Sequence, residues 1–288
     1  MNRGSPDSRT DRESLAEVRR RLKARGEQTG KADFDIAPAA IDLGLLSRTG
    51  GDAEAYVRHL KALSRDVSLY LADHIDVDGA LEALVQIIAR RYGYGGDEDS
   101  FEDLDAANLT RVIDSRRGLP VALGILYIHV AREQGWQACG IDFPGRFLVR
   151  LEVDGDRRLF DPFEDGRVLS PYDLRELLKS AAGLDAELTP AHYREASDRD
   201  VLMRLQNNIK VRLLRRERLD DALTVIENTL LIAPDEPALW REAGMIHARH
   251  DRIRDAIHAL EHHMRLDSRT ESRYSTSLLL QELRGKLH

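Results

Sequence analysis

The pattern of hydrophobic and polar positions is strongest near the middle of the chain. Apolar residues fill nearly every position from Val121 to Val130, which is typical of a helix buried on all sides. Pro120 stands just before this run, where the first helical turn tolerates a residue without an N–H. Gly135 follows a polar stretch and can end the helix. The pattern predicts a core helix from about Pro120 to Gln134.

Two strand-like runs follow this helix. They are Phe147–Val153 and Arg157–Phe160, and the Asp154-Gly155 pair between them favours a tight hairpin turn. A buried helix followed by an antiparallel hairpin predicts an α+β core.

The N-terminal part of the chain changes character at Phe34. The first 33 residues are polar and rich in Arg, Asp, Ser and Gly, which predicts a disordered tail. After Phe34, apolar residues recur at helical spacing, with Asp52 and Asp78 as expected N-caps. Helices are expected at about residues 38–46, 52–72, 78–92 and 108–115.

The C-terminal part reads as helical repeats. From Asp198 onwards the pattern is entirely helical, and the segment ending at Ala222 aligns with the segment ending at Ala256, 34 positions later. Small residues repeating with that period are typical of tetratricopeptide (TPR) repeats. We therefore expect a polar tail at 1–33, a core with N-terminal helices at 34–190 and an all-α repeat tail at 198–288.

Composition and charge restrict the class of protein. Hydrophobic residues make up 42% of the chain and charged residues 32%, as in globular proteins that fold in water. A net charge of −7 argues against nucleic acid as a partner. A single cysteine excludes a disulfide framework within the chain and favours the cytoplasm. No run is apolar enough for a membrane span, and the N-terminus lacks the apolar segment of a signal peptide, so no membrane contact is expected.

Three motifs carry a resemblance to a known family. The segments R-R-G-L-P-V-A-L, F-P-G-R-F-L-V-R and F-D-P-F resemble the bacterial SirB-type family of transglutaminase-like proteins with a TPR tail. The resemblance implies a transglutaminase-like core, in which a central helix packs on an antiparallel sheet. It also implies a nucleophilic Cys at the start of that helix, a His on the next strand and an Asp on the strand after. It implies no metal and no cofactor.

This chain departs from that triad at two positions. Pro120 stands at the nucleophile position and Arg146 at the His position, while Asp161 keeps the acidic residue. Nucleophilic catalysis needs a thiol or hydroxyl next to a base, and arginine stays protonated. The resemblance therefore makes Pro120, Arg146 and Asp161 the positions of a vestigial triad, as in a pseudoenzyme, and leaves any catalytic residues unknown.

Two interpretations remain open for the arginines near this region. Arg146 and Asp161 can form an ion pair that only holds two strands together. Alternatively, Arg116, Arg117 and Arg146 can line the former cleft and bind a carboxylate or phosphate group of a partner.

Other reactive side chains are expected to be structural. Cys139 lies in a short apolar run rather than at a helix N-terminus, which favours a buried, inert thiol. His258 and His262 are four residues apart on an expected helix, but the repeat pattern already accounts for this segment. No metal and no cofactor are expected.

The sequence favours a regulatory or scaffolding protein that is not an enzyme. Such a protein would act through protein–protein contacts of its degenerate core and its TPR-like tail, with a protein or peptide as partner. The alternative is a transglutaminase-like amidohydrolase or peptidase with a non-standard nucleophile, for which Ser115 or Cys139 would have to serve.

Overall fold

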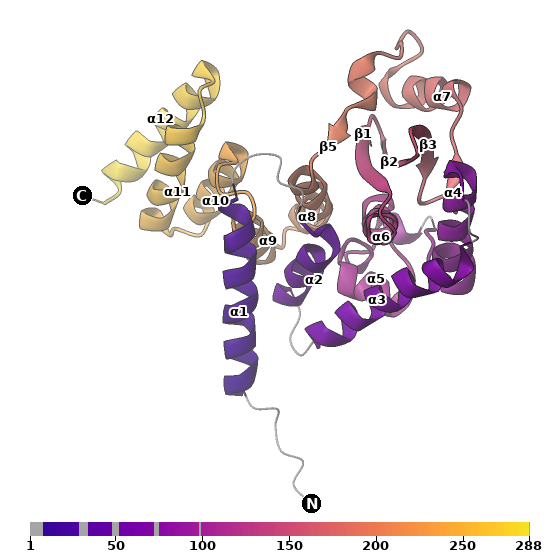
Figure 1. Ribbon diagram of the computed structural model, residues 1–288. Coiled ribbons are helices and arrows are strands. Elements are labelled where there is room, and N and C mark those ends of the chain that lie inside the picture. Colours follow the sequence, from indigo (N-terminus) through magenta and orange to yellow (C-terminus); the bar gives the residue numbers. More distant parts are fainter. Residues whose placement is uncertain (1–7, 29–33, 48–51, 72–74, 98, 288) are drawn as a thin grey trace, which may run out of the picture. The chain divides into compact units, whose positions relative to one another are not determined.

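The chain folds into two compact units. The computed structural model describes residues 8–28, 34–47, 52–71, 75–97 and 99–287. The core unit is Lys31–Leu205, and the repeat unit combines Met1–Gly30 with Gln206–His288. Figure 1 labels the helices and strands of both units.

The N-terminal helices of the core unit follow the predicted pattern, with one correction at a cap. Helix α2 spans Ile36–Leu46, and α3 spans Ala53–Tyr70 with Asp52 accepting a hydrogen bond from the Glu54 N–H at 2.9 Å. Helix α4, Val77–Val85, is capped by Asp76, whose Oδ1 accepts from the Gly79 N–H at 2.8 Å. The prediction of Asp78 as N-cap is wrong, because that residue already lies in the first helical turn. Helix α4 continues as a π-helical segment, Gln86–Arg91.

A buried helix and an antiparallel sheet form the centre of the core unit, as predicted. Helix α5, Leu109–Ser115, leads to α6, Pro120–Glu133, which is buried at every position from Val121 to Ala131. The sheet has the order β4-β3-β2-β1-β5. Its strands are β1 Gln137–Phe143, β2 Arg146–Val153, β3 Asp156–Asp161, β4 Arg167–Val168 and β5 Glu195–Ala196.

The two faces of the sheet pack on different helices. On one face, the Phe147 ring lies against Gly124 of α6, where an added Cβ would come within 2.5 Å of the ring. Phe160 is on the same face, and its ring centroid is 5.3 Å from that of Tyr127 of α6. On the other face, Leu148 packs in a cluster with residues of α7, Pro171–Ala182. Successive side chains of β2 and β3 therefore point alternately towards α6 and towards α7.

The repeat unit consists of helices joined by short turns. Ala222 and Ala256 are both fully buried, and Gly244 packs so closely on Leu260 that an added Cβ would lie 2.6 Å from its Cγ. Small residues at these positions let the paired helices approach each other. The helices are α8 Asp198–Arg215, which begins in the core unit, α9 Leu219–Leu230, α10 Pro237–Arg249, α11 Ile253–Leu266 and α12 Thr270–Gly285.

The N-terminal helix α1, Ser8–Gly26, also belongs to the repeat unit. The prediction of a disordered tail is wrong for these residues, because Val18 and Leu22 are buried. Gly26 lies directly against the Leu231 carbonyl, and an added Cβ would overlap it. Apolar residues four apart are enough to dock one face of an otherwise polar helix. Residues 1–7 and 29–33 lie outside the described residues.

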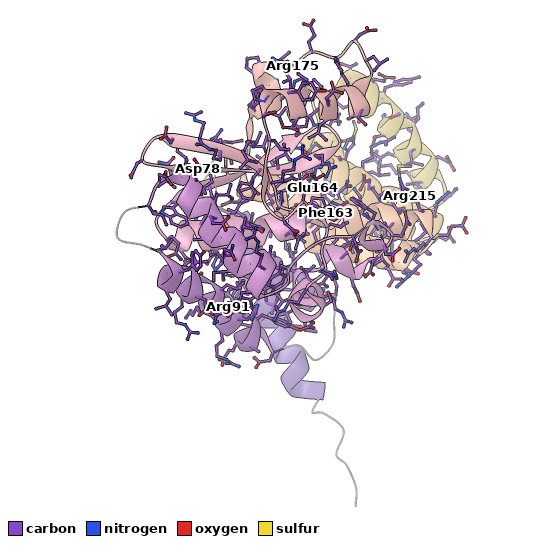
Figure 2. The ribbon with its side chains drawn as sticks, turned by 90° about the vertical axis from the view of Figure 1, so that its right-hand side faces the viewer. Asp78, Arg91, Phe163, Glu164, Arg175 and Arg215 are labelled. Atoms are coloured by element: carbon purple, nitrogen blue, oxygen red, sulfur yellow. The ribbon has the colours of Figure 1, made fainter. Side chains whose placement is uncertain are left out.

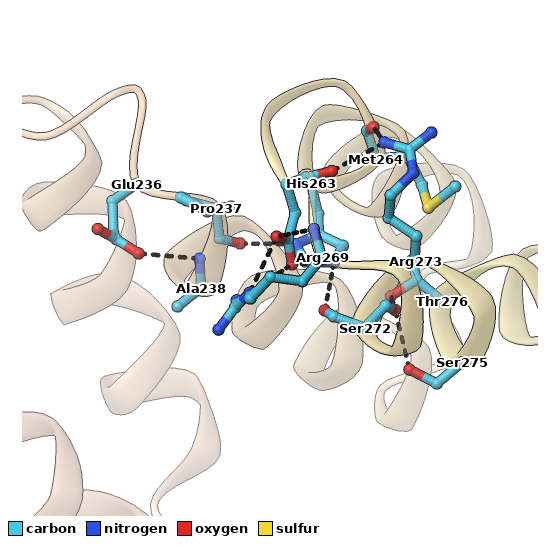
Figure 3. A network of polar contacts seen from close by, with 11 residues as sticks. Glu236, Pro237, Ala238, His263, Met264, Arg269, Ser272, Arg273, Ser275 and Thr276 are labelled. Carbon is cyan, nitrogen blue, oxygen red and sulfur yellow. Dashed lines mark hydrogen bonds and ion pairs between the residues drawn. The ribbon is translucent and has the colours of Figure 1, made fainter.

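A polar network fixes the junction of α11 and α12 (Figure 3). The buried His263 ring lies with Nδ1 2.9 Å from the Pro237 carbonyl and Nε2 3.1 Å from Ser272 Oγ. Arg269 and Arg273 both bond to Asp267, through its carboxylate and its carbonyl respectively. The network gives His263 a structural role in the turn.

Candidate functional site

Arg146 and Asp161 lie together on the α7 face of the sheet. Arg146 is the first residue of β2 and Asp161 is the last residue of β3. The neighbour of each along its strand faces α6. Phe147 and Phe160 are those residues, so the charged pair points to the opposite side. Arg146 and Asp161, which the sequence predicted as partners, are therefore in contact. They lie on the face of the sheet that points away from α6.

The pair is a direct ion pair. Arg146 Nη1 donates to Asp161 Oδ2 at 2.8 Å, and Arg146 Nη2 lies 3.1 Å from Glu164 Oε1. Asp161 Oδ1 accepts from the Phe163 N–H at 2.8 Å. The Asp161 side chain is 1% exposed and that of Arg146 is 28% exposed, so the carboxylate is the buried partner. Figure 2 labels Phe163 and Glu164 in the segment that follows β3.

The pair continues into a chain of charges that reaches α7. Glu164 Oε2 accepts from Arg167 Nη1 at 2.9 Å, and Arg167 Nη2 donates to Asp173 Oδ1 at 2.5 Å. Asp173 forms the capping box of α7 with Ser170. The network thus connects the ends of β2 and β3 with the N-terminus of α7.

Burial and the neighbouring arginine act in opposite directions on Asp161. Burial raises the pKa of Asp161 and is the largest effect, while the Phe163 N–H and the Arg146 guanidinium lower it. The raised pKa means that removing the carboxylate from water outweighs the attraction of its partners. Arg146 itself cannot act as a base, because it is a cation that is already bound by two carboxylates.

The third vestigial position lies elsewhere. Pro120 is the first residue of α6, which packs on the face of the sheet opposite to the Arg146–Asp161 pair. A proline carries no nucleophile, and a working triad needs its three groups within hydrogen-bond reach of one another. Only two of the three predicted positions are therefore in contact.

The three candidate arginines have separate partners. Arg116 has a left-handed backbone, with φ 64°, and its guanidinium lies 4.7 Å from the centre of the Tyr94 ring. Arg117 Nε lies 3.7 Å from an Asp97 carboxylate oxygen. Arg146 pairs with the carboxylates described above. Each arginine is thus engaged within the chain, and an anion-binding role for the three stays a prediction.

Arg116 also contacts a histidine that the sequence did not single out. Its Nη1 is 2.9 Å from His59 Nε2, which is in turn 2.7 Å from the Tyr94 hydroxyl. Burial, followed by the Arg116 charge, lowers the pKa of His59 to about 4. His59 is therefore a neutral hydrogen-bonding partner at neutral pH. No sequence signal marks it, since 57 residues separate it from Arg116.

One of the two alternative nucleophiles, Cys139, has a candidate base beside it, the Glu195 carboxylate. The Cys139 thiol donates to Glu195 Oε1 at 3.5 Å, and burial raises the pKa of Cys139 to about 12. Ser115 Oγ accepts from the Arg117 N–H at 3.2 Å and lies 3.3 Å from the Arg117 carbonyl, which is a local turn. Burial thus keeps the Cys139 thiol protonated at neutral pH although a carboxylate lies beside it, and the Ser115 hydroxyl bonds to backbone groups.

A cavity of about 450 Å³ opens beside Cys139. Its lining includes Trp136, Arg150 and Glu195, and the two charged residues form an ion pair. Arg132, also in the lining, donates to the Ala138 carbonyl at 2.9 Å and to Asp198 at 2.8 Å. Both arginines of the lining are therefore paired with a carboxylate.

The histidines of the tail make aromatic contacts. The Trp240 ring stacks on His262 with centroids 4.2 Å apart and planes 14° apart, and His258 lies 4.6 Å from His262. His258 and His262 are four residues apart on α11, so both side chains lie on the face of the helix that contacts Trp240. The expectation that His258 and His262 are structural is thus supported by their packing.

Comparison with known proteins finds a family match for the core part of the chain and another for the repeat tail. The transglutaminase-like superfamily matches residues 54–207, and the tetratricopeptide repeat matches residues 209–281. A UPF0162 protein of Vibrio cholerae is 30% identical over 189 residues, which cover 65% of this chain and 70% of the relative. A UPF0162 protein of Xylella fastidiosa is 28% identical, with 74% of each chain covered.

A third relative bears the name of the resemblance found in the sequence. Protein SirB1 of Salmonella typhimurium is 28% identical over 191 residues, which cover 65% of this chain and 71% of the relative. The superfamily match covers the helix, the hairpin and the Arg146–Asp161 pair. The chain therefore belongs to the transglutaminase-like superfamily, with a tetratricopeptide-repeat tail, among relatives that include SirB1 and the UPF0162 proteins.

Proposed function

We propose that this chain is a non-catalytic regulatory or scaffolding protein that binds a protein partner through its repeat unit. The Arg146–Asp161 pair carries this proposal. A permanent cation at the strand position of the base, bound by Asp161 and Glu164, cannot accept a proton from a nucleophile. The ion-pair network gives these residues a different task, which is to hold the sheet to α7.

The repeat unit supplies a surface for such a partner. Tandem helical repeats commonly present a helical face to a peptide or a partner helix. On α12, Tyr274 is 67% exposed and Leu278, one turn later, is 50% exposed. These two residues form an apolar strip on the exposed side of this helix. We propose the cytoplasm as the place of action; no helix in the described part of the chain is long and apolar enough to cross a membrane.

The partner test uses the full chain as bait in a lysate of a bacterium that carries it. We expect a saturable partner whose capture falls at least tenfold for the Tyr274→Ser/Leu278→Ser variant. The matched control is Tyr172→Ser, which removes a 69% exposed tyrosine from α7 of the core unit and should leave capture unchanged. Equal capture by all three proteins would contradict a partner site on the repeats.

Catalysis is tested separately, with amide and glutamine-containing peptide substrates. We expect no turnover above that of a denatured sample. Turnover that disappears in Cys139→Ala or in Ser115→Ala would overturn the non-catalytic proposal and identify the nucleophile. Neither side chain contributes a large core contact, so both variants should fold.

A further inference from the structure

Three possible metal ligands meet where α2 begins and α6 ends. Asp35 directly precedes α2, while His129 and Glu133 lie one turn apart in the second half of α6. One donor atom from each of these side chains lies within 4.8 Å of the others. We propose that Asp35, His129 and Glu133 form a binding site for a divalent transition-metal ion of the Zn²⁺ type.

Local structure brings these donors together. Residues four apart on a helix share a face, which places Glu133 beside His129. Asp35 stands at the N-cap of α2, where an Asp side chain ordinarily accepts a bond from its own helix, but it makes no such bond. Its Oδ1 lies 2.9 Å from His129 Nδ1 instead. Pro38, at the third position of this helix, has no N–H to offer the carboxylate, which contacts the imidazole instead.

The donor set suits zinc. Imidazole nitrogen and carboxylate oxygen are both ligand types that Zn²⁺ takes, and three protein ligands leave its fourth position to a water. Two carboxylates with a neutral imidazole carry the charge that balances a dication. Zinc bonds of about 2.0–2.2 Å require the donor atoms to lie about 3.5 Å apart. Rotation of the two exposed carboxylate side chains can bring them to that separation.

The simpler alternative is a hydrogen-bonded ion pair between Asp35 and His129, with Glu133 merely exposed to solvent. The two interpretations differ over Glu133. In the ion-pair interpretation Glu133 has no partner to lose among the residues that the structure describes, whereas in the metal-site interpretation it supplies one of three ligands. Because Glu133 is exposed at the end of α6, its replacement leaves the fold intact.

The experiment uses the full chain, freed of metal with a chelator and dialysed, and titrates it with ZnCl₂ by calorimetry. We expect saturable binding of one ion at this site and a rise in Tm on zinc addition, because a ligand bound only to the folded state stabilises it. Glu133→Gln should weaken binding by about tenfold or more and reduce the zinc-dependent rise in Tm, while the metal-free Tm stays unchanged. Co²⁺ in place of Zn²⁺ should give visible absorption bands of a four-coordinate site.

The control addresses the histidines of the tail, which can bind zinc by themselves. His258 and His262 are four apart on α11, so the His258→Ala/His262→Ala variant removes the competing pair. We expect its zinc affinity at the proposed site to equal that of the wild type. Three results would overturn the proposal: no saturable binding by the wild type, equal affinity in Glu133→Gln, or loss of binding in the His258→Ala/His262→Ala variant.

Discussion

At the scale of single residues, the Arg146–Asp161 pair is asymmetric. Asp161 is almost fully buried and Arg146 is partly exposed. Removing the arginine leaves a buried carboxylate whose charge is stabilised by backbone N–H groups of Phe163 and Glu164 and no longer by a cation. Removing the aspartate leaves an arginine that still pairs with Glu164 and contacts solvent. The two single variants should therefore differ.

We expect Arg146→Ala to lower the free energy of unfolding by about 3 kcal/mol, since it leaves a buried charge unpaired. Asp161→Ala should cost about 1–3 kcal/mol. Denaturant melts of both variants and of the double variant should give a coupling energy of at least about 0.5 kcal/mol. The control is Arg157→Ala, whose ion pair with Glu152 is exposed and should contribute less than about 1 kcal/mol. A coupling energy near zero would show that the pair does not stabilise the fold.

The raised pKa of Asp161 predicts a pH dependence of stability with a definite sign. Between the ordinary pKa of 3.8 and the raised folded-state value, the folded chain binds more protons than the unfolded chain. Stability contributed by this group is therefore present in acid and decreases as pH rises through that window. Asp161→Asn removes the titration but keeps an acceptor for the Phe163 N–H.

The measurement for this prediction is the difference in unfolding free energy between the wild type and Asp161→Asn, across acidic pH. That difference should fall with rising pH and then level off. Other carboxylates, such as Asp66 and Asp173, have lowered pKa values and act in the opposite direction, but they are common to both proteins. A difference that increases with pH would contradict the burial of this carboxylate.

At the scale of elements, the sequence predicted those whose pattern is carried by many residues. Helix α6 and the β2–β3 hairpin are confirmed, because a continuous apolar run and a turn with positive φ at Asp154 and Gly155 each have few alternatives. Strand β1 was not predicted as an element, since Gln137, Gly140 and Asp142 interrupt its apolar positions. Strand β5 has only two residues, and tertiary contacts alone define it.

The candidate site was predicted only where a family motif marked it. Arg146 and Asp161 stand in such motifs. His59 and the Asp35–His129 contact do not, and 94 residues separate the latter two in sequence. Contacts of that kind depend on how the helices pack, which a pattern of apolar positions does not specify.

Close packing of paired helices in the repeat unit gives a prediction at this scale. Ala256 is fully buried, so Ala256→Leu should overpack the interface and lower stability by about 1–3 kcal/mol. Ala222→Leu should have a similar effect at the equivalent position of the preceding repeat. The control is Ala238→Leu, at an exposed position of α10, which should change stability by less than about 0.5 kcal/mol. Equal melting temperatures for all three variants would contradict the assigned repeat register.

At the scale of the whole molecule, the two ends of the chain form one unit. Helix α1 contributes Val18 and Leu22 to the interior of the repeat unit, and its last residue, Gly26, lies against Leu231. Two visible repeats are fewer than the three that such arrays usually need for stability. Helix α1 adds buried apolar surface at a position that the repeats alone would leave uncovered. The N-terminal segment is thus part of the structure of the repeat unit.

This arrangement predicts that Leu22→Ala destabilises the repeat unit. Truncating a fully buried leucine should cost about 2–5 kcal/mol, because the remaining cavity is only partly filled by its neighbours. Hydrogen exchange should show the loss of protection in α1 and in α9, because Gly26 contacts Leu231 and Ile232, which directly follow α9. Leu278→Ala provides the control, since it makes the same truncation on α12 at a half-exposed position and should cost less than about 1 kcal/mol. If both variants kept wild-type exchange rates, α1 would be a separate helix that contributes nothing to the repeats, and the three-repeat requirement would have to be met by another part of the chain.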